Sequence, residues 1–463
     1  MSGVSEVKNV LARALALTAL AGIGNTARAA DATDDSLTWY GVTLYGTVDL
    51  GYTYATRSVP LNDYFTTGEE YLIQKNSNKK VSTISENAMS QSKVGLRGIQ
   101  EFHEGWSGLF KLETAFNPLS GQITDALHSM TQNNGVALAN QNSNADSSRA
   151  GQAFQAAYAG VTSPTYGTLT FGFQNSLLLD NVLKYDPLGG SYAFSVIGFS
   201  GAAGGSGDTE DARLENSVKY VNQIDWFRVG GQFQSGNGTA TGGNASEFDL
   251  GGDYRGLSVD ATYANKHDGI ASTALSAAQL AALPKTISPD IALSNTVSDN
   301  WTASLDASYV VQSAKFSVGY EDIHFRKPSH PLPVGAQNIG GYVIGAVNNT
   351  AYNEHARIQQ VPWAGVKYSF TPRFDVFAAW YEYIQNNYSP TATCPGGNLA
   401  RTAKESGACS GRLAAYSLVA NYKFNRHFDV YGGAMWSHVA DGLASGYLNS
   451  VTIDPTIGGR FNF

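Results

Sequence analysis

The sequence predicts an all-β protein that forms a closed transmembrane barrel, and three observations support this fold class. Apolar and polar residues alternate through most of the chain. The composition, with Gly 50, Tyr 25, Phe 21 and only 15% charged residues, suits pleated strands and turns. The mean hydropathy of −0.20 fits a barrel in which only every second strand residue faces lipid.

The final stretch, residues 450–463, shows the alternation most clearly. Successive strand side chains point to opposite faces, so one face of this strand is apolar and the other is polar and charged. The apolar parity holds Val451, Ile453, Pro455, Ile457, Gly459, Phe461 and Phe463, and the polar parity holds Thr452, Asp454, Thr456, Gly458, Arg460 and Asn462. A polar face opposite an apolar one, repeated along the chain, predicts apolar residues outside and polar residues inside.

The first 29 residues are predicted to be a signal peptide rather than part of the fold. Lys8 and Arg13 form a basic start, residues 14–24 form a short apolar run, and residues 27–29 read A-R-A, a cleavage site. The apolar run is too short to span a membrane as a helix. We therefore expect residues 30–463 to form the barrel.

The first mature strand, residues 37–54, carries the same two-faced pattern as the last strand. The two can pair and close the sheet, which removes the edges that a membrane does not tolerate. Between them, strand pairs are joined by tight turns, and the predicted strands number sixteen. They are residues 37–54, 93–102, 109–116, 152–162, 168–174, 213–221, 227–234, 248–254, 257–265, 301–311, 315–324, 363–370, 374–383, 413–424, 428–438 and 450–463.

Long connections alternate with the tight turns. They are rich in Gly, Asn, Ser, Thr and Asp, as loops are. An even number of antiparallel strands with short turns on one side is the outer-membrane arrangement, in which the short turns are periplasmic and the long loops extracellular. The connections are residues 55–88, 117–151, 175–212, 235–247, 266–300, 325–358, 384–412 and 439–450. Within the fifth of them, residues 272–283 have a helical pattern and are expected to form a short helix.

Two hairpins form an internal repeat. Tyr368-Ser369-Phe370 followed by residues 374–377 (FDVF) recurs 54 residues later as residues 422–424 (YKF) followed by residues 428–431 (FDVY). Chance similarity between two hairpins is the plain alternative. In either case the aromatic residues lie where a membrane-interface girdle requires them.

The only cysteines, Cys394 and Cys409, lie in one Gly/Pro/Ser/Thr-rich stretch. After an export signal, a disulfide closing this loop is the expected state, with free thiols as the alternative. Two thiols are too few for a dedicated zinc site, and we expect no metal and no cofactor. The formal net charge of −8 argues against nucleic acid as a partner.

The sequence resembles the Gram-negative general porin family of the beta-proteobacterial type over essentially all of the mature chain. The matching segments are residues 42–49 (VTLYGTVD), 92–98 (SKVGLRG), 166–173 (YGTLTFGF), 216–220 (NSVKY), 420–424 (ANYKF) and 460–463 (RFNF). The resemblance implies a sixteen-stranded outer-membrane barrel, a homotrimer, and a third extracellular loop folded into the lumen. It also implies contact with outer-membrane lipid and lipopolysaccharide, and that Phe463 is an assembly signal for the barrel-insertion machinery.

Candidate pore residues follow from strand parity and from this third loop. A charge on the lipid face costs roughly 2–4 kcal/mol at the midplane, so mid-strand charges are expected to face the lumen. The expected pore wall is Lys93, Arg97, Arg213, Lys219, Lys423 and Arg460, and the expected loop side of the constriction is Asp180, Asp186, Asp208, Glu210 and Asp211. Carboxylates facing a basic wall would set a transverse field at the narrowest point; the alternative is that these are solvated or locally balanced charges.

The predicted function is a water-filled channel for passive diffusion of ions and small hydrophilic solutes. One alternative is a barrel that acts mainly as a surface adhesin or receptor through its long loops. Another is a barrel enzyme, but the histidines lie in no nucleophile-elbow, H-E-x-x-H or metal-ligand pattern. We therefore expect no enzymatic activity.

Overall fold

The computed structural model describes residues 37–58, 79–123, 125–137, 153–197, 213–236, 242–337, 339–389, 391, 394 and 406–463. The predicted signal peptide and three of the predicted constriction residues, Asp208, Glu210 and Asp211, lie outside these ranges. Within the described residues, no helix is both long and apolar enough to cross a membrane.

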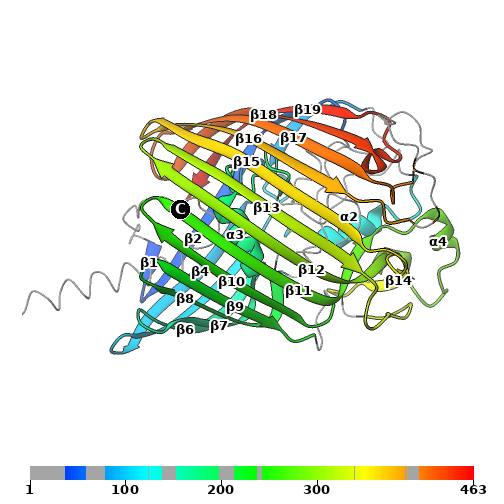
Figure 1. Cartoon of the computed structure of the whole chain (residues 1–463), viewed down its shortest axis with the longest axis horizontal. Helices are drawn as coiled ribbons and strands as arrows, with labels where there is room; N and C mark the ends of the chain where they lie inside the picture. The colour runs from blue at the N-terminus through cyan, green and yellow to red at the C-terminus, as the bar shows by residue number, and fades with distance from the viewer. Residues whose placement is uncertain are drawn as a thin grey trace, which may run out of the picture.

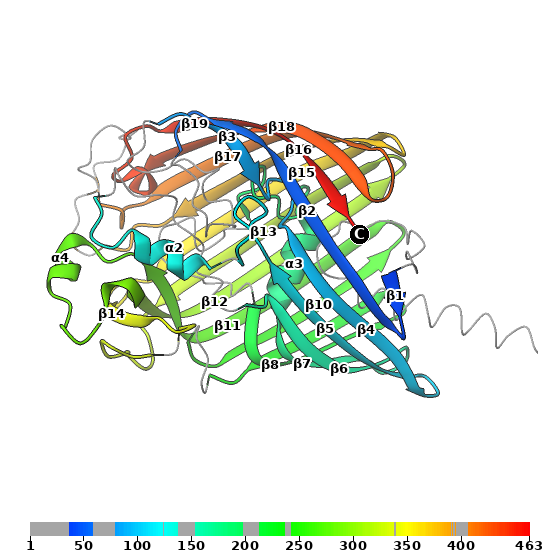
Figure 2. The same ribbon diagram turned by 180° about the vertical axis from the view of Figure 1, so that it is seen from behind.

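Sixteen antiparallel strands form a closed ring (Figures 1 and 2). Each predicted strand is present, and most begin and end within a few residues of the expected positions. In ring order they are β2 (Val42–Ala55), β4 (Lys93–His103), β5 (Trp106–Ala115), β6 (Ala156–Ser163), β7 (Gly167–Asn175), β8 (Arg213–Ile224), β9 (Phe227–Gln234), β10 (Ala245–Tyr254), β11 (Leu257–Thr273), β12 (Ala292–Val311), β13 (Ala314–Arg326), β15 (Arg357–Thr371), β16 (Phe374–Gln385), β17 (Gly411–Lys423), β18 (Phe428–Asp441) and β19 (Val451–Asn462).

Three further short strands extend this wall. β1 (Thr38–Trp39) pairs with the start of β2. β3 (Val81–Glu86) pairs with the C-terminal half of β2, and β4 pairs with its N-terminal half. β14 (Val343–Asn348) runs parallel to the first residues of β12. β3 and β14 were not predicted, because each lies in a segment with loop-like composition. β1 lies within the predicted strand 37–54, which a turn at Tyr40 and Gly41 divides into β1 and β2.

One predicted connection is strand over about half of its length. Residues 266–300 were expected to form a long loop, but β11 continues to Thr273 and β12 already begins at Ala292. The two strands stay paired to Thr273 and Ser294, past an irregularity between Lys266 and Gly269. The short helix expected in this region is present as α4 (Ala277–Ala281), capped by Ser276 and Gln279 and followed by the 3-10 turn η5 (Pro289–Ile291).

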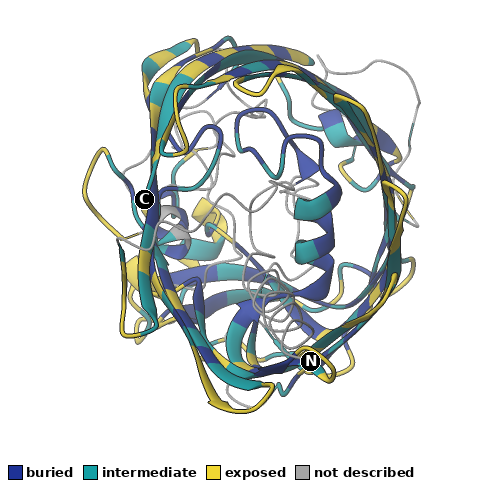
Figure 3. Cartoon of the chain, turned by 90° about the vertical axis from the view of Figure 1, so that its left-hand side faces the viewer, coloured by how far each residue is buried: buried dark blue, intermediate teal, exposed yellow. Residues whose placement is uncertain are grey.

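Strand parity sorts the side chains as expected. Figure 3, viewed along the barrel, shows buried and exposed residues alternating around the ring, with helical and loop segments inside it. The outer face is apolar, and exposed aromatic residues gather at the end with the short turns. These include Phe102, Tyr166, Trp226, Tyr254, Phe370 and Phe424, which form the interfacial girdle of a membrane barrel.

β2 and β19 close the ring, as the matching patterns of the first and last strands predicted. Thr47 pairs with Asn462 and Thr53 with Thr456. Phe463 adds two backbone hydrogen bonds to Gly46, donating through its amide and accepting through its carbonyl. The seam is narrow at Gly51, where an added Cβ would lie 2.2 Å from the Ile457 carbonyl oxygen.

We expect Gly51→Ala to weaken this seam because the backbone of β19 must move to admit the methyl group. Steric overpacking of this kind costs roughly 1–3 kcal/mol. The measurement is the temperature at which the folded, fast-migrating band is lost on a semi-native gel. Gly231→Ala on β9 is the control, since a Cβ there would meet nothing within 4 Å; equal unfolding temperatures for the two variants would contradict the prediction.

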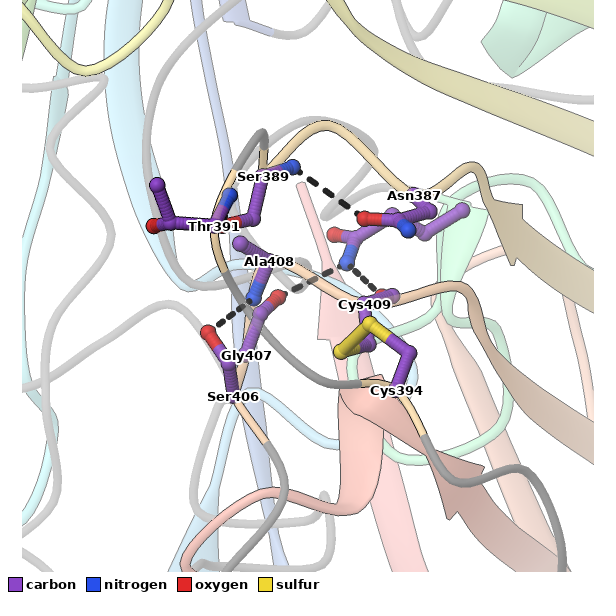
Figure 4. The surroundings of a disulfide bond; sticks show 9 residues. Asn387, Ser389, Thr391, Cys394, Ser406, Gly407, Ala408 and Cys409 are labelled. Atoms are coloured by element: carbon purple, nitrogen blue, oxygen red, sulfur yellow. Dashed lines mark hydrogen bonds between the residues drawn. A yellow bond between two sulfur atoms is a disulfide. The ribbon is translucent and has the colours of Figure 1, made fainter.

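The loop between β16 and β17 contains a disulfide between Cys394 and Cys409, with the two Cα atoms 5.6 Å apart (Figure 4). The Gln385 side-chain amide donates to the carbonyl oxygens of Gly407 and Cys409, each at 2.8 Å. Gln385 therefore holds the Cys409 end of this loop against the end of β16, and the disulfide ties Cys394 to it.

Candidate functional site: the lumen and its third loop

The third long loop folds into the lumen and begins with a helix, α3 (Leu177–Tyr185). The Ser176 hydroxyl caps this helix by accepting from the Leu179 amide at 2.9 Å. Glu247 of β10 accepts the amide of Leu177 at 2.6 Å, so a carboxylate lies at the positive end of the helix dipole. The sequence LLLDNVLKY carries the apolar stripe of this helix, which we did not predict.

One face of α3 is bound to the wall formed by β10 and β11. Asn181 donates to the Asp249 carboxylate at 2.7 Å and to the Thr262 hydroxyl at 2.6 Å. Lys184 forms an ion pair of 2.7 Å with Asp260, which also accepts the Tyr185 hydroxyl at 2.6 Å. Burial lowers the pKa of Lys184, and the Asp260 carboxylate opposes that shift.

After α3, the loop crosses the lumen to β16 and β17, five positions further round the ring, and is anchored again. The Tyr381 hydroxyl of β16 donates to Asp186 at 2.6 Å, and the Tyr383 hydroxyl donates to the Val196 carbonyl at 2.6 Å. Ser417 of β17 donates to the Phe194 carbonyl at 2.6 Å. Two contacts reach the segment between β3 and β4, where the Ala88 carbonyl accepts from Ser191 and from the Ala193 amide.

Apolar contacts complete this second anchor. Phe194, Val196 and Ile197 are fully buried against wall residues that include Phe325, Trp363 and Met435. Trp363 fits because it lies against Gly319, where an added Cβ would be 2.0 Å from the indole ring. The described part of the loop, residues 175–197, is thus held at both ends and narrows the lumen.

Asp186 occupies a position that differs from the one we expected. Its side chain has no exposed surface, so it does not face the pore water. Its carboxylate accepts from Tyr381 and from the amides of Leu188 and Gly190, at 3.2 and 2.6 Å for the amides. Burial raises the pKa of Asp186, and these donors oppose the shift. The residue anchors the loop instead of lining the channel.

Asp180 lies where the loop leaves the wall, as expected for a loop carboxylate. It forms an ion pair with Lys219 of β8 and accepts a hydrogen bond from the side-chain amide of Asn175 at 2.9 Å. Asp180 is about twice as exposed as its partner, 23% against 11%. This pair joins the start of the constriction loop to the basic wall.

The predicted wall residues form two separate groups in the lumen. In the first group, Lys93 and Lys111 lie 3.4 and 3.2 Å from the Glu113 carboxylate, and the Arg97 guanidinium lies over the Tyr45 ring at 5.2 Å. Arg213 begins β8 and pairs in register with Asn175 at the base of the loop. The first group therefore covers β4, β5 and β8.

The second group lies on β15 to β19. Asp375 binds Lys367 at 3.3 Å and Lys423 at 2.5 Å, and Arg460 binds Asp429 at 2.6 Å. Asp375 and Asp429 are equivalent positions of the internal repeat, so the two repeated hairpins each bring one carboxylate to this group. Within the described chain, no three His, Cys, Asp or Glu side chains converge to hold a metal ion.

A strap formed by residues 117–123 and 125–137 crosses the mouth at the long-loop end. It contains α2 (Ala126–Gln132) and runs from β5 to β12, which lie seven positions apart in the ring (Figure 2). Asn134 donates to the carbonyls of Pro289 and Ala292, each at 2.8 Å, and accepts the Leu275 amide at 2.7 Å. Leu127 and Met130 are buried with Leu293 and Ile344.

We expect Asn134→Ala to loosen the strap, because its three hydrogen bonds to backbone groups of residues 275, 289 and 292 are lost. A loss of about 2 kcal/mol would make local opening about thirtyfold more frequent. The measurement is the rate at which a protease cleaves within residues 117–137 of the folded barrel. Asn387→Ala, whose side chain accepts only a local bond from Ser389, is the control and should cleave there at the wild-type rate; an unchanged rate in Asn134→Ala would count against the strap.

Comparison with known proteins agrees with this architecture. A family model described as Gram-negative porin matches residues 16–442. The chain belongs to the Gram-negative porin family. As a porin it is an outer-membrane protein whose strands enclose a water-filled channel for passive diffusion of ions and small hydrophilic solutes, and its family and fold indicate a channel rather than an enzyme.

Solved porin structures share the fold at low sequence identity. An anion-selective porin from Comamonas acidovorans is 15% identical, with a TM-score of 0.58, and the match covers 91% of this chain and 99% of that one. A trimer form of OmpT, an outer membrane protein of Vibrio cholerae, is 14% identical with a TM-score of 0.54, covering 91% and 99%. Salmonella typhi OmpF is 14% identical with a TM-score of 0.50, covering 91% and 97%. Among curated proteins, none matches this chain in sequence.

Sequence reasoning missed the tyrosines that bind the loop. Tyr381 and Tyr383 share the inward parity of Asp375 on β16. Large aromatic residues on the polar face of a barrel strand need a partner inside the lumen, and this was the available signal.

Proposed function

We propose that this porin is an anion-preferring channel whose constriction is formed by the third loop facing the two basic groups of the wall. The observation that supports this is an asymmetry of exposure within the ion pairs. The side-chain exposures are 21% for Lys93 against 3% for Glu113, and 22% for Lys367 against 2% for Asp375. Arg460 and Asp429 follow the same order, 20% against 7%.

This asymmetry determines what a passing ion meets. In these pairs the carboxylate is the more buried partner, and the ammonium or guanidinium group is the one that contacts the pore water. Charge near the water dominates the local potential because the effective dielectric screening grows with distance. Two of the described Lys and Arg pairs have the opposite order, with the carboxylate more exposed. They are Lys219 with Asp180 at the base of the loop and Arg228 with Asp253 near the short turns.

We further propose that the channel assembles as a homotrimer and that Phe463 serves as its assembly signal. The trimer form of the Vibrio cholerae neighbour supports the first point, and the position of Phe463 at the closing seam supports the second. Residues 1–29 are proposed to be the export signal, and lipopolysaccharide and the barrel-insertion machinery are the proposed partners during and after insertion.

The test is single-channel recording of refolded protein in a planar bilayer under a salt gradient. Conductance steps in groups of three and a reversal potential of the sign set by chloride are expected. A reversal potential set by potassium would overturn the anion preference. No conductance from protein shown to be folded and inserted would overturn the proposed channel and favour a surface adhesin or receptor.

A further inference from the structure

The second basic group lies in a recess between the wall and the third loop, with a volume of about 980 Å³ including space open to solvent. Its wall side holds Lys367, Lys423, Arg426 and Arg460, together with the carboxylates of Asp375 and Asp429. Asp49, which is fully buried beside Arg460, adds one further negative charge nearby. The recess therefore keeps an excess of one positive charge.

The positive side chains are the ones available to a solute. Asp375 is buried and already accepts from Lys423, Lys367 and the Ser369 hydroxyl, the last at 2.6 Å. Asp429 is bound by the Arg460 guanidinium through two nitrogens, at 2.6 and 3.3 Å. Lys367, Lys423 and Arg460 are each about one-fifth exposed, and Arg426 is exposed in the turn after β17.

The loop side of the recess is mainly apolar, and one apolar residue lies on the wall. Leu183 of α3, Pro187 and Leu188 come from the third loop, Met89 comes from the segment between β3 and β4, and Phe377 lies on the wall. The Lys367 ammonium lies 5.6 Å from the centre of the Phe377 ring. Cations on one side and an apolar surface on the other select a solute that has both characters.

We infer that this recess binds amphipathic organic monoanions, that is, carboxylates with a small apolar body, as they pass through the channel. The carboxylate lies among Lys367, Lys423 and Arg460, and the apolar body contacts Leu183 and Leu188. The inference rests on the proposed channel only as the route by which the solute arrives. It adds a saturable site to a pore that otherwise discriminates by charge and size.

The first group of basic residues provides a matched comparison within the same lumen. Lys93 and Lys111 share Glu113 as Lys367 and Lys423 share Asp375. Substituting one lysine of either pair leaves the other to neutralise the buried carboxylate, so both variants are expected to fold. Lys423→Gln tests the recess, and Lys93→Gln removes the same charge elsewhere in the lumen.

The experiment measures binding of benzoate, acetate and benzyl alcohol to the full-length folded protein in detergent, by calorimetry or ligand-observed NMR. Benzoate is expected to bind at least tenfold more tightly than acetate, which lacks the apolar ring, and than benzyl alcohol, which lacks the carboxylate. Lys423→Gln is expected to weaken benzoate binding at least fivefold, and Lys93→Gln to leave it within twofold. Leu183→Gln is expected to reduce benzoate to the affinity of acetate, which a purely electrostatic effect would not produce.

The outcomes separate this inference from the proposed channel. Equal affinity for benzoate and acetate, or equal weakening by Lys423→Gln and Lys93→Gln, would overturn the recess. If that occurs while bilayer recordings still show an anion-preferring conductance, only the recess fails. Selective benzoate binding by a folded protein that does not conduct would leave the recess standing and overturn the channel.

Discussion

The double variant Tyr381→Phe/Tyr383→Phe is expected to release the far end of the third loop and to raise the mean single-channel conductance. Both hydroxyls donate to the loop from β16, one to the buried Asp186 carboxylate and one to the Val196 carbonyl. Losing a hydrogen bond to a buried acceptor costs about 1–3 kcal/mol each. Phenylalanine keeps the ring volume, so the barrel wall itself should remain intact.

The measurement is the distribution of open-channel currents in a planar bilayer. Wild-type protein should give one narrow conductance level, and the double variant should give a higher and broader one. Tyr309→Phe, which removes a hydroxyl from an exposed side chain near the short-turn end of β12, is the control and should match the wild type. A double variant with wild-type current and noise would show that apolar contacts alone hold the loop.

The triple variant Lys93→Gln/Lys219→Gln/Lys367→Gln is expected to shift the reversal potential strongly toward the potassium value. One unit charge about 7 Å away through water changes the free energy of a monovalent ion by roughly 0.6 kcal/mol, about one RT. Each lysine removed should therefore lower anion occupancy about threefold. The effect should shrink as the salt concentration rises, because the field is screened.

These three lysines leave no buried carboxylate without a partner. Glu113 keeps Lys111, Asp375 keeps Lys423, and Asp180 keeps the Asn175 amide. Lys285→Gln is the control because Lys285 is exposed beyond the barrel, next to α4. An unchanged reversal potential in the triple variant would mean that the proposed asymmetry of exposure does not control selectivity.

The barrel could be predicted because the membrane imposes a simple rule on its strands. Wherever a strand crosses lipid, one parity must be apolar, and all sixteen segments chosen by that rule are strands of the ring. The rule fails where lipid ends. Residues 292–300 of β12 carry Asn295, Thr296 and Ser298, and they read as a loop because this part of the strand is paired to β11 and β14 without an apolar outer face.

The interior could be predicted only in part, for a different reason. Inward parity identified the basic residues, since it depends on each strand alone. The partners of the loop depend on contacts between residues far apart in sequence. Asp186 was assigned to the pore surface as a loop carboxylate, and nothing adjacent to it in the sequence indicates that Tyr381, 195 positions later, buries it.

The anchoring of the third loop has a consequence for the order in which the protein matures. Residues 186–197 are held by β16 and β17, and Tyr431 of β18, which packs against Phe194, donates its hydroxyl to Asp49 of β2. These strands come late in the chain, so the loop has no complete docking surface until the carboxy-terminal hairpins have been inserted and the ring has closed. A barrel arrested before closure would lack this docking surface, so narrowing of the pore should follow closure of the ring.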